Sequence, residues 1–89
     1  MKIEKKNDGF VAKIDDKVIG EIDYVKEGDV LRANHTYVDP DHRGEGLAGK
    51  LFDSLIDFAR KENYKIEPVC SYVVKRFEQS DEFDDLLSK

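Results

Sequence analysis

The hydrophobic period of this chain changes once, and a short glycine-rich segment marks the change. Up to Val38, apolar residues alternate at period two, which is typical of strands. From Leu47 to about Glu62 they recur with a period of about 3.6, which is typical of an amphipathic helix. Between these segments lies Arg43-Gly44-Glu45-Gly46-Leu47-Ala48. The chain is therefore expected to fold as a sheet that leads through a tight turn into one long helix.

The residues before the turn are predicted to form consecutive antiparallel strands. A run at 10–14 leads through a tight connection at 15–17 into a run that alternates at Val18, Gly20, Ile22 and Tyr24. A second turn at 27–29 precedes another run, which places four residues on one face: Leu31, Ala33, His35 and Tyr37. Residues 1–6 are expected to add an edge strand.

The segment after the long helix is predicted to contain one more strand and short helices. Asn63 is suited to a left-handed helix cap, and residues 65–70 indicate a strand that Pro68 interrupts. A short helix is expected around 73–77, and a last one from Ser80 through Leu87. The pattern predicts an α+β fold, with one long helix on a mostly antiparallel sheet of about four to five strands and short C-terminal helices.

Length and composition describe one small domain that spans residues 1–89. With 39% hydrophobic and 39% charged residues, the chain can build a single modest core. No stretch approaches the roughly 18 apolar residues of a membrane span, and the amino terminus lacks the apolar core of a signal peptide. We therefore expect a cytoplasmic protein with no membrane partner.

Charge and cysteine content argue against several kinds of site. The net charge is −5 and the basic residues are scattered, so the long-range field should repel DNA or RNA, and no nucleic-acid partner is expected. Cys70 is the only cysteine, which excludes an intramolecular disulfide and a cysteine-based metal cage. His35 and His42 have no further ligand at metal-binding spacing, so no metal site is expected.

The glycine-rich turn is the strongest candidate for a binding site. Gly44 and Gly46 let the backbone approach a bulky ligand, and the first N–H groups of the following helix lack intrahelical partners. With the helix dipole behind them and with His42, Arg43 and Lys50 nearby, these donors suit a phosphate or pyrophosphate. The Walker and Rossmann phosphate motifs fit poorly, because their spacing or their parallel architecture is missing. The alternative is a tight turn that binds nothing.

The segment from Val38 to Ala48, between a strand and a long amphipathic helix, closely resembles the acetyl-CoA motif of the GNAT superfamily of N-acetyltransferases. That motif is Arg or Gln, two residues, Gly, one residue, then Gly or Ala, and Arg43, Gly46 and Ala48 fill it. Two further segments look like a minimal subfamily of small GNAT-like proteins: His35-Thr36-Tyr37-Val38 and Pro68-Val69-Cys70-Ser71-Tyr72-Val73.

This resemblance implies an acetyl-CoA cofactor and a set of residues that bind it. In the superfamily, backbone N–H groups of the turn bind the coenzyme A pyrophosphate, which here implies Arg43, Gly44, Glu45, Gly46, Leu47 and Ala48. The preceding strand holds the pantetheine arm and the acetyl carbonyl, which implies Thr36, Tyr37 and Val38. The acceptor would be an amine or a protein that the sequence does not identify.

The chain departs from larger superfamily members in two ways. The helices that usually follow the first strand, and that build part of the acceptor site, are missing, because the N-terminal third is predicted to be strands throughout. Where larger members commonly place a tyrosine general acid, this chain has Phe77, which carries no hydroxyl. The proton for a leaving thiolate must then come from another group.

Cys70 and His35 are the candidate catalytic residues. Cys70, at the predicted end of the last strand, suits an acyl acceptor or proton donor, or else it is a buried cysteine that packs as a small hydrophobe. An unperturbed imidazole titrates near physiological pH, so His35 is either a general base for an amine or a hydrogen-bonded packing residue. Tyr72 is either a proton donor or an anchor for the start of a helix.

Three functions are compatible with these residues. The leading hypothesis is an acetyl-CoA-dependent N-acetyltransferase that transfers acetyl to an unidentified amine or protein acceptor. The second is a module that binds or senses acetyl-CoA without turnover, which the missing acceptor helices and Phe77 favour. The third is an interaction domain that uses an exposed edge strand.

Overall fold

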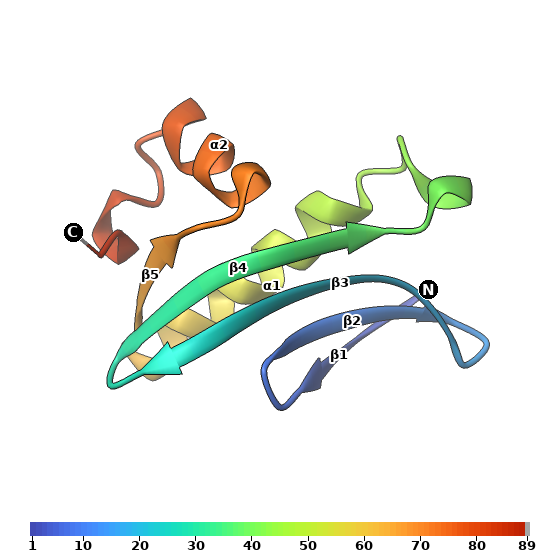
Figure 1. The fold of residues 1–89 in the computed structure, drawn as a ribbon, viewed down its shortest axis with the longest axis horizontal. Helices are drawn as coiled ribbons and strands as arrows, with labels where there is room; N and C mark the ends of the chain where they lie inside the picture. Colours follow the sequence, from blue (N-terminus) through green and yellow to red (C-terminus); the bar gives the residue numbers. More distant parts are fainter. Residues whose placement is uncertain (89) are drawn as a thin grey trace.

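The computed structural model describes residues 1–88 and contains a five-stranded sheet in the order β1-β2-β3-β4-β5 (Figure 1). The strands are β1 (Lys2–Lys6), β2 (Gly9–Ile14), β3 (Lys17–Glu27), β4 (Val30–Val38) and β5 (Lys65–Pro68). Neighbouring strands from β1 to β4 are antiparallel, whereas β5 pairs with β4 in parallel. The predicted α+β fold with a mostly antiparallel sheet is confirmed.

The long helix α1 (Leu47–Glu62) connects β4 to β5 and covers one face of the sheet (Figure 1). Its apolar stripe is buried against the strands, and each large side chain removed from water contributes roughly 1.5 to 3 kcal/mol. The helix approaches β3 closely at Gly20, where a Cβ would lie 3.1 Å from Leu47 Cδ2. The absence of a side chain at Gly20 therefore sets how near the start of α1 sits to the sheet.

The rest of the chain packs at the β5 side of the sheet (Figure 1). Helix α2 (Ser71–Gln79) follows β5, and a short 3₁₀ turn, η2 (Asp84–Leu86), precedes the end. Phe52 of α1 makes edge contacts with Phe77 and Phe83, with ring centroids 5.9 and 5.1 Å away. This aromatic cluster fixes α2 against α1. No helix among residues 1–88 is both long and apolar enough to cross a bilayer.

Several predicted boundaries are confirmed and others are corrected. α1 begins and ends where the periodicity places it, and Asn63 adopts the left-handed cap with φ of 61°. The strand predicted over residues 65–70 stops at Pro68, because proline has no N–H to continue the pairing. The last helix, predicted from Ser80 through Leu87, is wrong, since only η2 forms there and Leu87 instead bridges to β5.

A β-bulge in β3 corrects the predicted face of Val18. Between β2 and β3 the register pairs Ala12 with Gly20 and Lys13 with Val18, which leaves Ile19 as an extra residue. Ile19 is consequently 1% exposed and belongs to the core, whereas Val18 is 40% exposed. A strict period of two cannot reveal an inserted residue of this kind.

A second bulge, in β4, corrects the predicted faces of His35 and Tyr37. The register pairs Tyr24 with Ala33 and Asp23 with His35, so Asn34 is the extra residue. Leu31 and Ala33 face α1 as predicted, but His35 and Tyr37 turn to the opposite, exposed face. Beyond the bulge, Thr36 and Val38 take over the face toward α1, which places Thr36 opposite the buried Ile22.

Candidate functional site

The turn between β4 and α1 presents an open backbone surface. After β4, a short 3₁₀ turn, η1 (Pro40–His42), leads into Gly44 and Gly46, whose φ angles are 86° and 76°. Both values lie in the left-handed region, where a side chain is disfavoured. A Cβ at either glycine would find no heavy atom within 4 Å, so space in front of the turn is free for a ligand.

The first turn of α1 leaves its donors available. Gly46 is the N-cap residue and supplies no side-chain hydrogen bond, and the first turn contains no acidic residue. The first intrahelical bond from this end is donated by Lys50 to the Gly46 carbonyl at 3.1 Å. The preceding amides and the positive end of the helix dipole therefore form a site suited to an anion.

A hollow of about 430 Å³ opens at this turn. Val38, Arg43, Gly44, Gly46, Leu47 and Ala48, all predicted ligands, line one side of it together with His42 and Gly49. Tyr72 and Arg76 of α2 line the other side. Arg76 was not predicted, because only the packing of α2 on α1 brings it here. The spacing of Tyr72 and Arg76, which places both on one helix face, is the sequence signal that points to it.

Glu45, which would repel a bound phosphate, is not among the residues that line the hollow. Its Oε1 lies 3.2 Å from Nδ1 of His42, a lining residue, and its side chain is 60% exposed. Arg43 is oriented by a bond from its Nε to the Val38 carbonyl at 3.4 Å. In residues 1–88, no acidic side chain lines the hollow, which leaves the charge of Arg43 uncompensated there.

Asp39 stabilises the segment between β4 and the glycine-rich turn. Its carboxylate caps η1 by accepting a bond from the Asp41 amide at 2.9 Å, and Lys17 lies 3.6 Å away. The hydrogen bond from the Asp41 amide, and secondly the charge of Lys17, lower the pKa of the Asp39 carboxyl. A hydrogen bond from a backbone amide to an ionised carboxylate thus fixes the backbone path between β4 and the glycines.

Strands β4 and β5 diverge next to the turn. Their last pair is Ala33 with Pro68, and the amides of Val69 and Cys70 both donate to the Ala33 carbonyl, at 3.0 and 2.9 Å. Farther along, the Asp39 amide donates to Ile19 of β3 at 2.7 Å. Because amide directions alternate along a strand, the amides of Thr36 and Val38 point to the other edge, where β5 has left the sheet.

Cys70 lies at this divergence, at the N-cap position of α2 rather than within a strand. Its thiol is half-buried, and Sγ lies 3.3 Å from Oγ1 of Thr36. The structure therefore brings two predicted site residues, Thr36 and Cys70, into contact.

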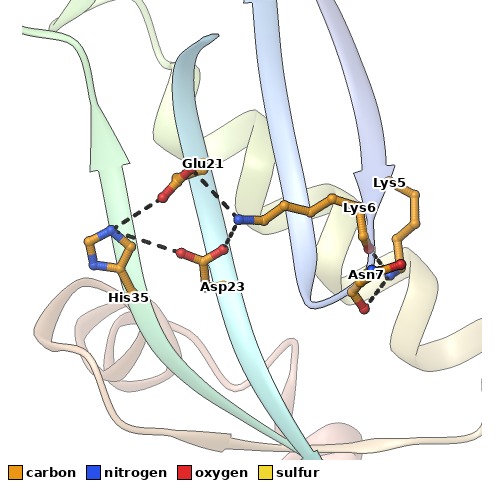
Figure 2. A network of polar contacts seen from close by, with 6 residues as sticks. All are labelled: Lys5, Lys6, Asn7, Glu21, Asp23 and His35. Carbon is orange, nitrogen blue, oxygen red and sulfur yellow. Dashed lines mark hydrogen bonds and ion pairs between the residues drawn. The ribbon is translucent and has the colours of Figure 1, made fainter.

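His35 is not part of that contact, because the bulge at Asn34 places it on the opposite face of β4. Its Nε2 lies 3.6 Å from Oε1 of Glu21 and 3.9 Å from Oδ2 of Asp23 (Figure 2). The side chain is 53% exposed. Tyr37 shares this face, and its backbone pairs with Glu21 of β3. Of the three predicted strand residues, only Thr36 and Val38 direct their amides to the edge that β5 leaves.

Lys6 joins the same cluster from β1 (Figure 2). Its ammonium pairs with Asp23 and lies 3.7 Å from Oε2 of Glu21. The hydrogen bond to Asp23 is the main reason that the pKa of Lys6 is raised, and the two carboxylate charges add to it. The side-chain atoms of Glu21, Asp23 and His35 that could coordinate a metal lie within 4.8 Å of one another. The spacing of these residues along the chain did not predict this cluster. The single lysine ammonium offsets one of the two carboxylate charges.

Comparison with known proteins decides the family. A family model described as GCN5-related N-acetyltransferase matches residues 9–86. The chain belongs to this GNAT family. No curated protein matches the chain by sequence. A GCN5-like protein from Staphylococcus aureus, solved by NMR, is 25% identical with a TM-score of 0.79, over 98% of this chain and 87% of that one.

Two larger enzymes share the fold of this GNAT protein. The ribosomal-protein-S18-alanine N-acetyltransferase from Escherichia coli is 20% identical with a TM-score of 0.68, over 80% of this chain and 49% of that one. An aminoglycoside N-acetyltransferase in complex with CoA is 15% identical with a TM-score of 0.58, over 80% of this chain and 63% of that one. The chain thus spans about half to two thirds of their lengths. Family and fold support an N-acetyltransferase role.

Two aromatic residues bear on proton transfer in this GNAT protein. Phe77, at the position expected to carry a tyrosine, is buried in the core against Phe52. Tyr72 instead places a hydroxyl at the hollow, where it accepts a hydrogen bond from Nη1 of Arg76 at 2.8 Å. The phenol therefore lies at the site, and the ring at 77 serves packing.

Proposed function

We propose that residues 1–89 form one domain that binds acetyl-CoA and transfers the acetyl group to an amine of a small molecule or protein. The observation that carries the proposal is the continuity of two features, an anion site at the start of α1 and an open edge of β4 where β5 diverges. A diphosphate and an extended amide-containing arm need such a pair of neighbouring surfaces. The CoA complex of the aminoglycoside enzyme, which shares the fold, supports this assignment.

Binding is assigned to the predicted residues by their positions. The amides of Arg43, Gly44, Glu45, Gly46, Leu47 and Ala48 would hold the pyrophosphate, with the Arg43 guanidinium adding charge. The strand segment of Thr36, Tyr37 and Val38 would hold the pantetheine arm and the acetyl carbonyl along the open edge, through the amides of Thr36 and Val38. Side chains at the glycines would fill the space that the ligand needs.

In the proposed transfer, residues on the two faces of β4 have different roles. Acetyl-CoA would supply a thioester whose carbonyl carbon the amine attacks, with the C–S bond breaking and CoA leaving as a thiolate. His35, exposed beside Glu21, would accept the proton that the amine loses. Cys70, at the N-terminus of α2 and against Thr36, would give a proton to the thiolate or take the acetyl group first.

A titration and a turnover assay test the proposal separately. Acetyl-CoA at up to about millimolar concentration should shift the amide resonances of residues 43–48 and raise the melting temperature, as expected for a ligand of the native state. Absence of both effects would remove the cofactor assignment. Release of free thiol with a panel of amines and peptides then tests transfer. Mass spectrometry tests acetylation of Cys70, and turnover unchanged in Cys70→Ala would exclude a chemical role for its thiol.

A binding module without turnover is the second candidate, and two observations favour it. Phe77 offers no hydroxyl, and His35 and Cys70 lie on opposite faces of β4. Residues 1–38 also contain no helix that would shape an acceptor site. Binding of acetyl-CoA without thiol release for any amine or peptide in the panel would favour this function.

A further inference from the structure

We propose that Arg76 of α2 is a second anion-binding side chain of the hollow, and that it makes the site selective for acyl donors that carry phosphate. This inference rests on the proposed acetyl-CoA site and adds a residue that the GNAT motif does not contain. Arg76 lies well after the motif in the sequence and reaches the hollow only through the packing of α2.

Arg76 lies where the electrostatic environment is unfavourable for a cation. Nη1 would lie 3.3 Å from a Cβ at Gly49, so the guanidinium packs directly against the first turn of α1. That turn carries the positive end of the helix dipole and contains no acidic residue, so a cation there is unfavourable unless an anion joins it. Arg43 adds a second positive charge to the lining of the same hollow.

The compensation that the protein itself offers Arg76 is weak. Its nearest carboxylate oxygen, Oδ1 of Asp53, is 4.0 Å from Nη2, and the Asp53 side chain is 66% exposed. Exposed pairs at such a distance contribute little. The excess of positive charge in the hollow therefore suits a diphosphate, which carries more negative charge than a carboxylate of the chain.

The side chain is also held in place before a ligand arrives. Cζ of Arg76 lies 4.5 Å from the centroid of the Phe52 ring, and Nη1 donates to the Tyr72 hydroxyl at 2.8 Å. One donor is used in this way, and the planar guanidinium retains others for a bidentate contact to phosphate oxygens. Because the side chain is already ordered, binding does not have to pay again for that order.

The test compares acetyl-CoA with S-acetylpantetheine, which has the same reactive arm and no phosphate. In Arg76→Gln, acetyl-CoA should bind at least about tenfold more weakly, which is typical of losing a hydrogen bond to a charged group. Binding of S-acetylpantetheine, followed by chemical-shift titration, should stay within about twofold of the wild-type value. The acetyl-CoA affinity of the variant should also depend less steeply on salt concentration.

Lys75→Gln is the matched control, since it removes the same charge from an exposed residue one position away on α2. It should leave both affinities within about twofold of wild type. Arg76→Lys is a second variant in case Arg76→Gln unfolds. It keeps the charge but loses the planar guanidinium that lies over Phe52, and it should weaken acetyl-CoA binding several-fold. Thermal unfolding checks that each variant is folded.

The outcomes separate this inference from the proposed function. Unchanged acetyl-CoA affinity in Arg76→Gln and Arg76→Lys, with the wild type binding normally, would overturn the role of Arg76 and leave the cofactor site intact. Equal losses for acetyl-CoA and S-acetylpantetheine would show that Arg76 only supports the packing of α2. Failure of the wild-type protein to bind acetyl-CoA would overturn both proposals.

Discussion

The two polar regions of the molecule handle charge in opposite ways. In the hollow beside α1, Arg43 and Arg76 meet the positive end of a helix, and no acidic side chain among residues 1–88 lines the space. On the other face of the sheet, Glu21 and Asp23 both pair with Lys6 and lie beside His35. The hollow is the uncompensated region and leaves positive charge for an anionic ligand, whereas the Lys6 cluster is the compensated region and offsets part of its negative charge within the chain.

One residue keeps the two regions apart. Because Asn34 is inserted in β4, Thr36 and Val38 face α1 while His35 faces the acidic pair. If Asn34 took a regular position in the alternation instead of forming a bulge, His35 would lie on the face of Leu31 and Ala33. The bulge therefore decides which region each residue of the predicted site joins.

Insertion of one alanine between His35 and Thr36 should have the largest effect and would break the separation itself. The inserted residue shifts the following side chains of β4 to the other face, so Thr36 and Val38 leave the face toward α1 and the Tyr37 side chain enters it. We expect a loss of at least about 4 kcal/mol in the free energy of unfolding, measured by urea denaturation.

The substitution Asn34→Ala is the control for that insertion, because it keeps the bulge and changes only an exposed side chain. It should change stability by no more than about 0.5 kcal/mol. An insertion variant that unfolds at the wild-type urea midpoint would show that β4 tolerates either register, contrary to the role given to the bulge.

Features fixed by local chemistry were predictable from the sequence. Gly44 and Gly46 before an amphipathic pattern predicted the turn and the start of α1, and Asn63 predicted its end. These signals work because the residue that occupies the position determines which backbone angles are available. The order of strands followed in the same way from turns and alternation.

Features that depend on insertion or docking were not predictable. A period of two does not reveal the bulges at Ile19 and Asn34, because the types of residue in the strand do not mark where an extra residue is inserted. The contact of Lys6 with Asp23 crosses β2 at Gly9, which lies between them in the register. Arg76 reaches the hollow only through tertiary packing of α2. Its spacing from Tyr72 places both residues on one helix face but does not indicate where that face docks.

The substitution Gly46→Glu should abolish the function of the uncompensated region. A carboxylate at the N-cap of α1 fills the open space and repels a diphosphate, so acetyl-CoA affinity should fall about a hundredfold or more in a titration. The left-handed φ of 76° adds a cost of about 1 to 2 kcal/mol in stability.

The substitution Gly28→Glu separates the loss of acetyl-CoA affinity in Gly46→Glu from its loss of stability. Gly28 has φ of 60° and open space around it, but it lies in the turn between β3 and β4, away from the hollow. It should lose similar stability and keep the affinity for acetyl-CoA. If Gly46→Glu binds acetyl-CoA as well as Gly28→Glu does, the hollow is not the phosphate site.

The smallest expected effect concerns the compensated region. Lys6→Met removes the ammonium from Glu21 and Asp23, and it should cost about 0.5 to 1 kcal/mol near neutral pH, because the pair is partly exposed. Acetyl-CoA affinity should change by less than about twofold, since the cluster lies on the other face of the sheet. A large loss of affinity would mean that the two regions are coupled.

The pH dependence of this difference tests its electrostatic origin. The pKa of Lys6 is raised above its usual 10.5, so the native state holds this proton more tightly than the unfolded state does. The stabilisation is therefore complete below the unfolded pKa and is lost as the pH rises through the folded pKa. Urea denaturation at about pH 8 and about pH 11.5 should show wild type and Lys6→Met converging at the higher pH. Lys61→Met, at an exposed position of α1, should show no such convergence, and a constant gap for Lys6→Met would assign its effect to packing.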